Sequence, residues 1–353
     1  MKLGLLFGGR SVEHDVSVTS ATSILAALDR ERFEIILIGV DTQGRWHLGN
    51  EGDSPAQALQ GPEVIFPPTH GSRELLDKTA GTARASLDVI FPIIHGAGGE
   101  DGRLQGLLDL TGIPYVGSGV LGSSIQMDKD ITKQLLRAAG IPVVPWHCVH
   151  SWELPVRGAE IAQAALDELG LPLFIKPSNL GSSVGISLVE SEADLLPALR
   201  EAARFDEKIL IEQGVDAREV EIAVLGGYEP EASVPGEIRP KTRFYDYESK
   251  YQDDSTELLI PAPVSEKVAE QAQSQAVTAF CLLEAWGLAR VDFFLERETG
   301  KLLLNEINSL PGFTQVSMYP QLWEASGLPY PALLNRLVDL ALERAKIRDR
   351  LQV

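Results

Sequence analysis

Cysteine is almost absent from this sequence: among 353 residues, only Cys148 and Cys281 are present. The two lie far apart and lack the spacing of a metal-binding cysteine pair. A framework of disulfides is therefore excluded, and the composition fits a protein of the reducing cytosol.

Long apolar runs are also missing. No stretch approaches the roughly 20 apolar residues that a membrane-spanning helix requires. The sequence opens with MKLGLLFGGRSVEHD, in which the short apolar run 3–7 is broken by glycine and followed by acidic residues. This run is too short for the core of a signal peptide. We therefore expect a cytoplasmic protein that remains in the compartment where it is made.

Basic residues are scarce, because 31 lysines and arginines stand against 50 aspartates and glutamates, a net charge of -19. That balance argues against nucleic acid or an anionic membrane as the main partner. A phosphorylated small molecule such as ATP remains possible if the few cations gather where its phosphates bind. The chain is long enough for two or three domains, and its content of hydrophobic and charged residues is ordinary for a globular protein.

The first 40 residues predict a strand–helix–strand unit. The run 3–7 stops at two glycines, as a buried parallel strand does. Apolar residues then recur at helical spacing over 21–28, and 34–40 again has the pattern of a strand.

A second unit of the same kind follows, with a strand at 87–94, the loop HGAGGEDG at 95–102, a helix and a strand at 113–116. Together the two units predict a doubly wound α/β domain. The intervening residues 42–86 are rich in glycine and proline, and we expect an irregular surface excursion of little function.

The glycine- and serine-rich stretch 117–124 marks the first predicted boundary, after which helices and strands follow a different order. The C-terminal half has α+β character, with a polar aromatic segment at 244–254 and a β-hairpin at 289–308. We expect three domains, at residues 1–122, 123–215 and 216–353.

The hairpin 289–308 places four polar residues on one face. If the hairpin is centred on Thr299 in the RETG turn, Asp292 lies opposite Glu306 and Arg290 lies opposite Asn308. All four side chains then point to one side, because side chains alternate along a strand.

Two carboxylates directly opposite each other repel, and a bound cation removes that repulsion. Asp292, Glu306 and Asn308 offer only oxygen ligands, which suit Mg²⁺ or Mn²⁺ rather than zinc. The alternative is a solvated hairpin face. Burial, and with it the metal site, is favoured by the apolar neighbours Val291, Phe293, Leu303 and Leu304.

The loop KPSNLGSSVG, residues 176–185, follows an apolar strand. Its backbone N–H groups and hydroxyls can surround phosphate oxygens, and Lys176 adds positive charge. It matches neither the GxxxxGK[ST] loop nor the GxGxxG fingerprint. A glycine-rich hairpin turn is an equally good interpretation, and Lys129 taken alone has the pattern of a surface lysine.

Other candidates follow predicted strands. Glu13 and His14 come after the first strand and His95 after the strand 87–94, at the carboxyl edge where open α/β sheets bind ligands. For His14 a structural role is favoured. The segment 244–254, FYDYESKYQDD, is either exposed surface or a lid that excludes water. The turn LPGF at 310–313 could offer a backbone N–H to an oxyanion.

Seven segments in order, over about residues 3–340, resemble the D-alanine–D-alanine ligase family: FGGRSVEHDVS, HGAGGEDGRLQG, YVGSGVLGSSIQMDK, IKPSNLGSSVG, FYDYESKY, RVDFF and NEINSLPGF. The resemblance implies an ATP-grasp fold preceded by the α/β domain, with ATP held between the second and third domains. It implies two ions of Mg²⁺ or Mn²⁺, and a homodimer. ATP would phosphorylate one D-alanine, and a second would displace phosphate to give D-alanyl-D-alanine for peptidoglycan synthesis.

The resemblance also implies roles for individual residues. Glu13 and His95 would bind the first D-alanine, and Ser317 would bind the carboxylate of the second. Arg290 and the N–H of Gly312 would stabilise the acyl phosphate and the oxyanion. The residues implied in catalysis are Glu13, Ser182, Tyr251, Arg290 and Gly312.

For ATP, the resemblance implies a phosphate site formed by Lys129, Lys176, Ser182, Ser183 and Lys250. Ser182 and Tyr251 would also join the loop to the lid. Adenine and ribose would be bound by Glu212, Gln213, Val215 and Glu219. The family often has lysine at position 213, a departure that matters little if the contact is through the backbone. The magnesium ligands would be Asp292, Glu306 and Asn308.

Several alternatives remain. A ligase joining D-alanine to D-lactate or D-serine shares the fold, and Tyr251 argues against it. Another carboxylate–amine ligase of the ATP-grasp class would keep the metal residues but not Glu13 and Tyr251. A non-catalytic sensor would have no use for opposed carboxylates beside Arg290, and no GxGxxG supports a nicotinamide-dependent dehydrogenase. The preference for D- over L-alanine rests on the resemblance alone.

Overall fold

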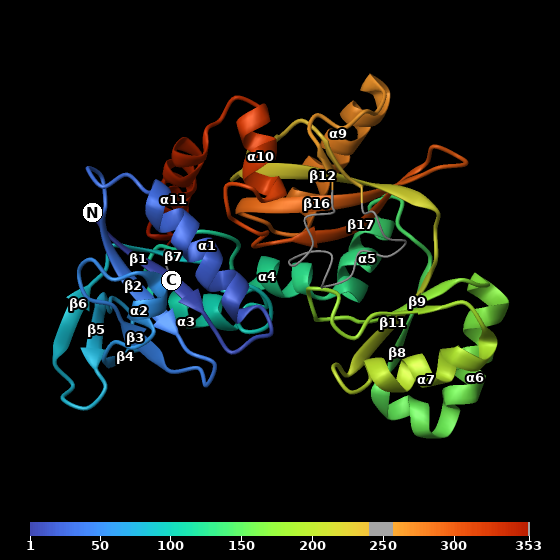
Figure 1. Ribbon diagram of the computed structural model, residues 1–353, viewed down its shortest axis with the longest axis horizontal. Coiled ribbons are helices and arrows are strands. Elements are labelled where there is room, and N and C mark those ends of the chain that lie inside the picture. Colours follow the sequence, from blue (N-terminus) through green and yellow to red (C-terminus); the bar gives the residue numbers. More distant parts are fainter. Residues whose placement is uncertain (240–256, 352–353) are drawn as a thin grey trace.

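The computed structural model describes residues 1–239 and 257–351, whose strands form three sheets (Figure 1). The predicted lid segment 244–254 lies outside these residues. No helix within the described ranges is long and apolar enough to cross a membrane.

The first sheet has the strand order β6-β5-β4-β3-β2-β1-β7. Its strands are β1 (Lys2–Gly8), β2 (Glu34–Val40), β3 (Trp46–Leu48), β4 (Glu63–Ile65), β5 (Glu74–Asp77), β6 (Ala83–Ser86) and β7 (Val89–Pro92). β1 pairs in parallel with both β2 and β7, as the two predicted units require. The helices of this region are α1 (His14–Ala27), α2 (Pro55–Ala58) and α3 (Arg103–Thr111).

The residues of β1 fit its place between the parallel strands β2 and β7, since every residue from Leu3 to Gly8 is buried. Helix α3 ends where Gly112 adopts a φ of 70°, a left-handed conformation that glycine takes without a steric penalty. The chain then returns toward the sheet, and Tyr115 makes a single parallel bridge with Ile90 where the sequence predicts a strand at 113–116.

The prediction that residues 42–86 are irregular was wrong. They contain β3 to β6 and α2, which extend the parallel strands by an antiparallel series. Each of these strands has only three or four residues, too few for alternation of side chains to be recognised in the sequence. Most of the glycine- and serine-rich stretch 117–124 lies in the helix α4 (Val120–Met127).

The second sheet has the order β10-β9-β11-β8, formed by β8 (Trp146–His150), β9 (Leu173–Pro177), β10 (Ser187–Val189) and β11 (Lys208–Gln213). Helices α6 (Leu154–Leu169) and α7 (Glu192–Ala202) lie side by side on one face (Figure 1). The turn η1 (Ser151–Glu153) precedes α6, and α5 (Lys129–Ala138) leads into this region. This sheet has an apolar core of its own, which includes Leu173, Ile175, Leu195 and Ile211.

The third sheet has the order β15-β14-β12-β16-β17, with β13 on β12. Its strands in the described residues are β12 (Ala217–Gly226), β13 (Glu231–Ala232), β14 (Gly236–Arg239), β15 (Glu257–Leu259), β16 (Gly287–Glu296) and β17 (Leu302–Asn308). The helix α9 (Glu266–Leu282) lies between β15 and β16 in sequence, and α10 (Met318–Ala325) and α11 (Tyr330–Arg348) follow β17.

The first and third sheets share one apolar core. Leu3 and Phe91 of the first sheet belong to the same buried cluster as Leu288 of β16 and Leu337 of α11. Helix α11 lies against α1, as Figure 1 shows. Since apolar burial is the main stabilising contribution in folding, these two sheets form one unit, to which the second sheet is added.

We expect Phe280→Ala to destabilise the protein by about 3–5 kcal/mol, because this ring is fully buried between α9 and the third sheet and its removal leaves a cavity. The neighbouring exposed Cys281 provides the control, and Cys281→Ala should change stability by less than about 0.5 kcal/mol. Urea unfolding of both variants measures the difference, and equal unfolding midpoints would contradict this packing.

Candidate active site

A cavity of about 2140 Å³ lies where the three sheets meet. Loops after β1 and β7, the strands β9 and β11, and the hairpin β16–β17 all contribute to its wall. The predicted site residues that line it are Glu13, His95, Lys129, Lys176, Ser182, Ser183, Glu212, Gln213, Val215, Glu219, Arg290, Asp292, Glu306, Asn308, Gly312 and Ser317. These are all the predicted site residues within the described ranges. Lys250 and Tyr251 lie outside them.

The predicted register of the hairpin is confirmed where it carries the polar residues. Arg290 pairs with Asn308, and Asp292 pairs with Glu306. Beyond them the register shifts at a β-bulge, so that Phe293 pairs with Leu304. The sequence did not reveal this bulge. The four polar side chains are unaffected, because they lie on one side of it, and all of them face the cavity.

Arg290 is held by carboxylates on two strands. Its Nε and Nη2 donate to the two carboxylate oxygens of Asp292 at 2.7 and 2.6 Å, and Nε lies 3.0 Å from Glu221 Oε2. Burial lowers the pKa of Arg290, but Asp292 and Glu221 raise it well above its usual value, so the guanidinium stays charged. Glu221 was missed by the sequence reasoning, although a glutamate between the apolar Val220 and Ile222 was a usable signal.

The hairpin residues fit a divalent cation. Asp292 and Glu306 face each other across neighbouring strands, and Asn308 Nδ2 donates to Asp292 Oδ2 at 2.9 Å, which leaves the amide oxygen of Asn308 as a donor to a metal. Within residues 1–239 and 257–351, no three His, Cys, Asp or Glu side chains form a metal-binding group. A metal here would therefore depend on the amide as well as the two carboxylates, a set of oxygen ligands suited to Mg²⁺.

A buried cluster of opposite charges lies where β9, β11 and α5 meet beside the cavity. The carboxylate of Glu212 is 2.5 Å from Lys176 Nζ and 3.1 Å from Lys133 Nζ. Burial raises the pKa of Glu212, but the two lysines lower it by more, so the net pKa is lowered and the carboxylate is ionised. Burial lowers the pKa of Lys133, and Glu212 opposes that change. Lys133 was not predicted, because helical spacing does not distinguish a buried lysine from an exposed one.

The loop 178–185 connects the antiparallel strands β9 and β10, so it is a hairpin connection as well as a candidate phosphate site. Ser182 and Ser183 have φ values of 49° and 57°, a left-handed conformation that is uncommon outside glycine. The hydroxyl of Ser182 donates to Glu13 Oε1. The loop therefore joins the second sheet to the first, across 169 positions of sequence.

His95 is buried and both of its ring nitrogens have partners. Nδ1 lies 3.0 Å from the carbonyl oxygen of Leu310, and Nε2 lies 3.0 Å from Ser20 Oγ. Burial lowers the pKa of His95, although Glu13 opposes this, so the ring is neutral. Because a carbonyl only accepts, Nδ1 carries the proton and Nε2 accepts from Ser20. The structural role predicted for His14 is confirmed, since its Nδ1 contacts the carbonyl of Gly9 at 2.9 Å.

Glu100 is a buried carboxyl group that the sequence reasoning did not identify. It accepts hydrogen bonds from Gly96 N at 2.6 Å, from Leu310 N at 3.2 Å and from Ser309 Oγ at 3.3 Å. Burial and, to a lesser extent, the charge of Glu13 raise the pKa of Glu100, and these hydrogen bonds lower it, with a net pKa of about 8. The group ties the loop after β7 to the loop after β17.

The loop after β17 leads into α10. Ser317 is the residue before the first turn of this helix, and its Oγ accepts from Thr314 N at 3.1 Å. A Cβ added to Gly312 would lie 3.2 Å from Ser317 Oγ, so the two residues are close together. Backbone N–H groups at the start of a helix favour anions, and this end of the cavity is therefore suited to a carboxylate.

Comparisons with known proteins agree with this architecture. Residues 2–118 match the family model described as D-ala D-ala ligase N-terminus, and residues 135–339 match D-ala D-ala ligase C-terminus. The chain is 47% identical to D-alanine–D-alanine ligase A of Chromobacterium violaceum over 361 residues, covering 99% of this chain and 98% of that one.

Two solved structures extend the comparison. The D-alanine-D-alanine ligase from Coxiella burnetii matches with a TM-score of 0.87 and 38% identity, covering 99% of this chain and 96% of that one. The VanG D-Ala:D-Ser ligase from Enterococcus faecalis matches with a TM-score of 0.86 and 32% identity, covering 96% and 99%.

The fold is that of the ATP-grasp ligases, preceded by an α/β N-terminal region, and the predicted fold class is confirmed. This class uses ATP to join a carboxylate to an amine. Within it, the chain belongs to the D-alanine–D-alanine ligase family.

The raised pKa of Glu100 predicts a pH dependence of stability. The folded protein retains a proton on Glu100 at pH values where the unfolded chain has released it, so this group's contribution to stability falls as pH rises from about 5 to about 8. Glu100→Gln removes the slope. The stability of the wild type relative to this variant should therefore decrease by about 1–2 kcal/mol between pH 6 and pH 8.

Urea midpoints of both proteins at the two pH values measure this double difference, in which titrating groups that do not interact with Glu100 cancel. A constant difference between the proteins would contradict the raised pKa.

Proposed function

We propose that this protein is an ATP-dependent ligase that joins two molecules of D-alanine into D-alanyl-D-alanine for peptidoglycan synthesis. One observation carries the proposal. The contact of Ser182 with Glu13 lies in the same cavity as the oxygen ligands and Arg290 of the hairpin. The carboxylate of Glu13, which could bind an ammonium, therefore lies in the same cavity as groups suited to phosphoryl transfer.

The reaction has two steps. A carboxylate oxygen of the first D-alanine attacks the γ-phosphorus of ATP, ADP leaves, and an acyl phosphate remains. The amine of the second D-alanine then attacks the carbonyl carbon, the attacking nitrogen releases a proton, and phosphate leaves from the tetrahedral intermediate to give the neutral amide. Phosphorylation is required because a carboxylate by itself is a poor electrophile.

The substrates would be oriented by residues from three parts of the chain. Glu13 would bind the ammonium of the first D-alanine, with His95 beside it, and the helix start at Ser317 would bind the carboxylate of the second. Arg290 and the N–H of Gly312 would stabilise negative charge on the acyl phosphate and the oxyanion. Each such donor contributes about 3–4 kcal/mol to stabilisation of the transition state.

The nucleotide would lie along the wall formed by α5, β9, β11 and the loop 178–185. Lys129 and Lys176 would face the phosphates, and Ser182 and Ser183 would contribute hydroxyls or N–H groups from the loop. Adenine and ribose would be bound by Glu212, Gln213, Val215 and Glu219. Because the Glu212 carboxylate is paired with two lysines, the backbone is the better candidate for the adenine contact.

Asp292, Glu306 and Asn308 would hold Mg²⁺ or Mn²⁺, in two ions, which would neutralise phosphate charge during transfer. Lys250 and Tyr251 would complete the site from the predicted lid. The three domains at 1–122, 123–215 and 216–353, the homodimer and the cytoplasmic location remain part of this proposal.

The substrate is tested by phosphate release with Mg-ATP in the presence of D-alanine alone, L-alanine alone, or D-alanine with D-lactate or D-serine. Turnover with D-alanine alone supports the proposal. Activity only when D-lactate or D-serine is added would identify a ligase for a mixed product instead, and activity only with L-alanine would refute the assignment.

Asp292→Ala and Glu306→Ala should each reduce kcat by at least about 10³-fold, because each removes a metal ligand from a phosphoryl-transfer site. Glu298→Ala is the matched control, since it removes a carboxylate from the exposed turn of the same hairpin and should leave kcat within about twofold. Phosphate release and circular dichroism are measured on all three. Substantial turnover by either folded ligand variant would refute the metal assignment.

A further inference from the structure

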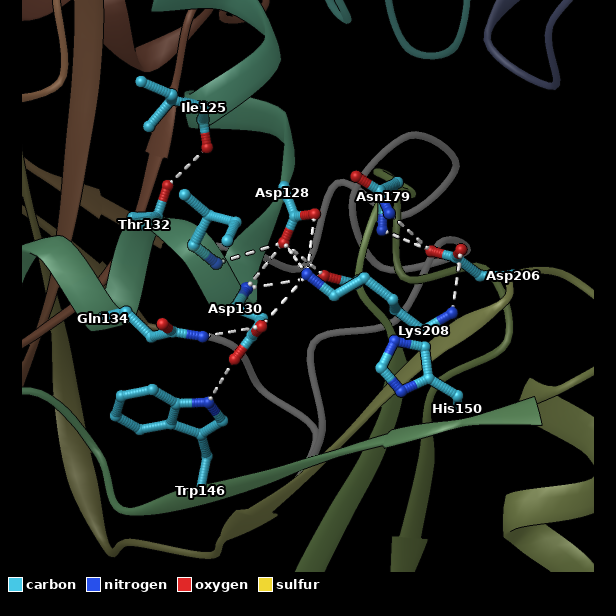
Figure 2. Close-up of polar contacts among 12 residues, drawn as sticks. Ile125, Asp128, Asp130, Thr132, Gln134, Trp146, His150, Asn179, Asp206 and Lys208 are labelled. Atoms are coloured by element: carbon cyan, nitrogen blue, oxygen red, sulfur yellow. Dashed lines mark hydrogen bonds and ion pairs between the residues drawn. The ribbon is translucent and has the colours of Figure 1, made fainter. Parts of the chain in front are cut away.

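A network of polar contacts lies behind the wall of the cavity, centred on Lys208 at the start of β11 (Figure 2). Its Nζ is 2.9 Å from both carboxylate oxygens of Asp128 and 3.0 Å from Asp130 Oδ2. The side chain of Lys208 is only 19% exposed, so these ion pairs are largely removed from water.

The two aspartates organise the first turn of α5. Asp128 is the N-cap, and its Oδ1 accepts from Asp130 N and Ile131 N, both at 3.1 Å. Asp130 accepts from Trp146 Nε1 at 3.0 Å, which ties the same turn to β8 (Figure 2). Lys129 lies between Asp128 and Asp130 in sequence, so the hydrogen bonds of these two neighbours fix the position of its backbone.

The same network holds the start of the loop 178–185. Ser178 Oγ donates to Asp128 Oδ1 at 2.9 Å, and Lys129 N donates to the carbonyl of Ser178 at 3.2 Å. Asp206 accepts from Asn179 N at 2.6 Å and from Lys208 N at 3.2 Å. The loop is thus attached both to the helix start and to β11.

Within this network, Lys129 points its side chain into the cavity and the other members do not line it. Lys129 Nζ donates to the carbonyl of Leu180 in the loop at 2.7 Å and lies 3.8 Å from Glu306 Oε2. The start of α5 and the loop 178–185 are therefore held at a fixed distance and orientation to each other. The hydrogen bonds and ion pairs of the network determine that distance and orientation.

We propose that Lys208 is a positioning residue that holds Lys129 and the loop 178–185 together as one phosphate-binding unit. The proposal rests on the nucleotide site proposed above. Lys208 acts through Asp128, Asp130 and Ser178 and is not in contact with the cavity. Without its ammonium, two neighbouring carboxylates lose their counter-ion in a partly buried place and repel each other. Their repulsion displaces Asp128 from Ser178 and so weakens the link between the helix start and the loop.

The protonation state agrees with this role. Burial lowers the pKa of Lys208, but the hydrogen bonds and charges of Asp128 and Asp130 raise it above its usual value. The ammonium is therefore retained at any pH at which the enzyme would be assayed.

The test compares Lys208→Met with Lys208→Arg in the full-length protein. KM for ATP is measured at saturating D-alanine, and KM for D-alanine at saturating ATP. We expect Lys208→Met to raise KM for ATP at least tenfold while changing KM for D-alanine less than twofold. Lys208→Arg should restore KM for ATP to within about threefold of the wild type, because it returns the charge.

Arg157→Met is the matched control. Arg157 is a cation on α6 that also pairs with two carboxylates, Glu153 and Glu160, but its side chain is 51% exposed. This control should leave both KM values unchanged. A loss of stability in Lys208→Met without any change in KM for ATP would show that Lys208 is only structural and would overturn the proposal.

Ser178→Ala provides a second test that can be used if Lys208→Met does not fold. It removes one hydroxyl from the link between the helix start and the loop, at a buried but small side chain. KM for ATP should rise about threefold with KM for D-alanine unchanged. An equal rise in both values, or no rise in either, would contradict the proposed unit.

Calorimetric titration with Mg-ADP separates this proposal from the function itself. Weaker ADP binding by Lys208→Met than by Arg157→Met supports the positioning role even if the wild type does not turn over D-alanine. In that case the substrate assignment fails and the role of Lys208 stands. Equal ADP affinity of the two variants overturns the role of Lys208.

Discussion

The pairing of buried carboxylates with the few available cations is the constraint on which this structure depends. Arg290 is placed against Asp292 and Glu221, and Lys176 is placed against Glu212. Breaking a buried pair leaves an uncompensated charge, so strands and helices that carry its partners cannot move independently. In a chain with a net charge of -19, Lys129, Lys176 and Arg290 all line one cavity, where they can face phosphate and carboxylate groups.

The distribution of apolar cores explains why polar contacts matter so much at this site. The first and third sheets share a core, whereas the second sheet has its own. At the cavity, the loop 178–185 of the second sheet contacts the loop after β1 through Ser182 and Glu13, and Lys129 of α5 contacts Glu306 of the third sheet. Hydrogen bonds and ion pairs depend strongly on direction and distance, and they therefore set the geometry of the loop 178–185.

Long elements were predictable and short ones were not. The strands β1, β2 and β16 follow the apolar runs in the sequence, because a strand of seven or more residues shows its pattern clearly. The strands within 42–86 are three or four residues long, and their pairing depends on the sheet edge that β2 provides. The bulge beside Asp292 was also beyond sequence reasoning, because an extra residue in one strand leaves no signal in alternation.

The sequence by itself determined the local chemistry: a hairpin that sets Asp292 opposite Glu306, with oxygen ligands for a hard cation and Arg290 on the same face. Its likeness to one family supplied the other candidate residues. Only the tertiary structure decided that Ser182 meets Glu13, that Lys133 shares Glu212 with Lys176, and that Glu100 joins two loops. The physical reason is range: side-chain alternation and capping act over a few residues, whereas contacts across 169 positions exist only after three sheets have packed.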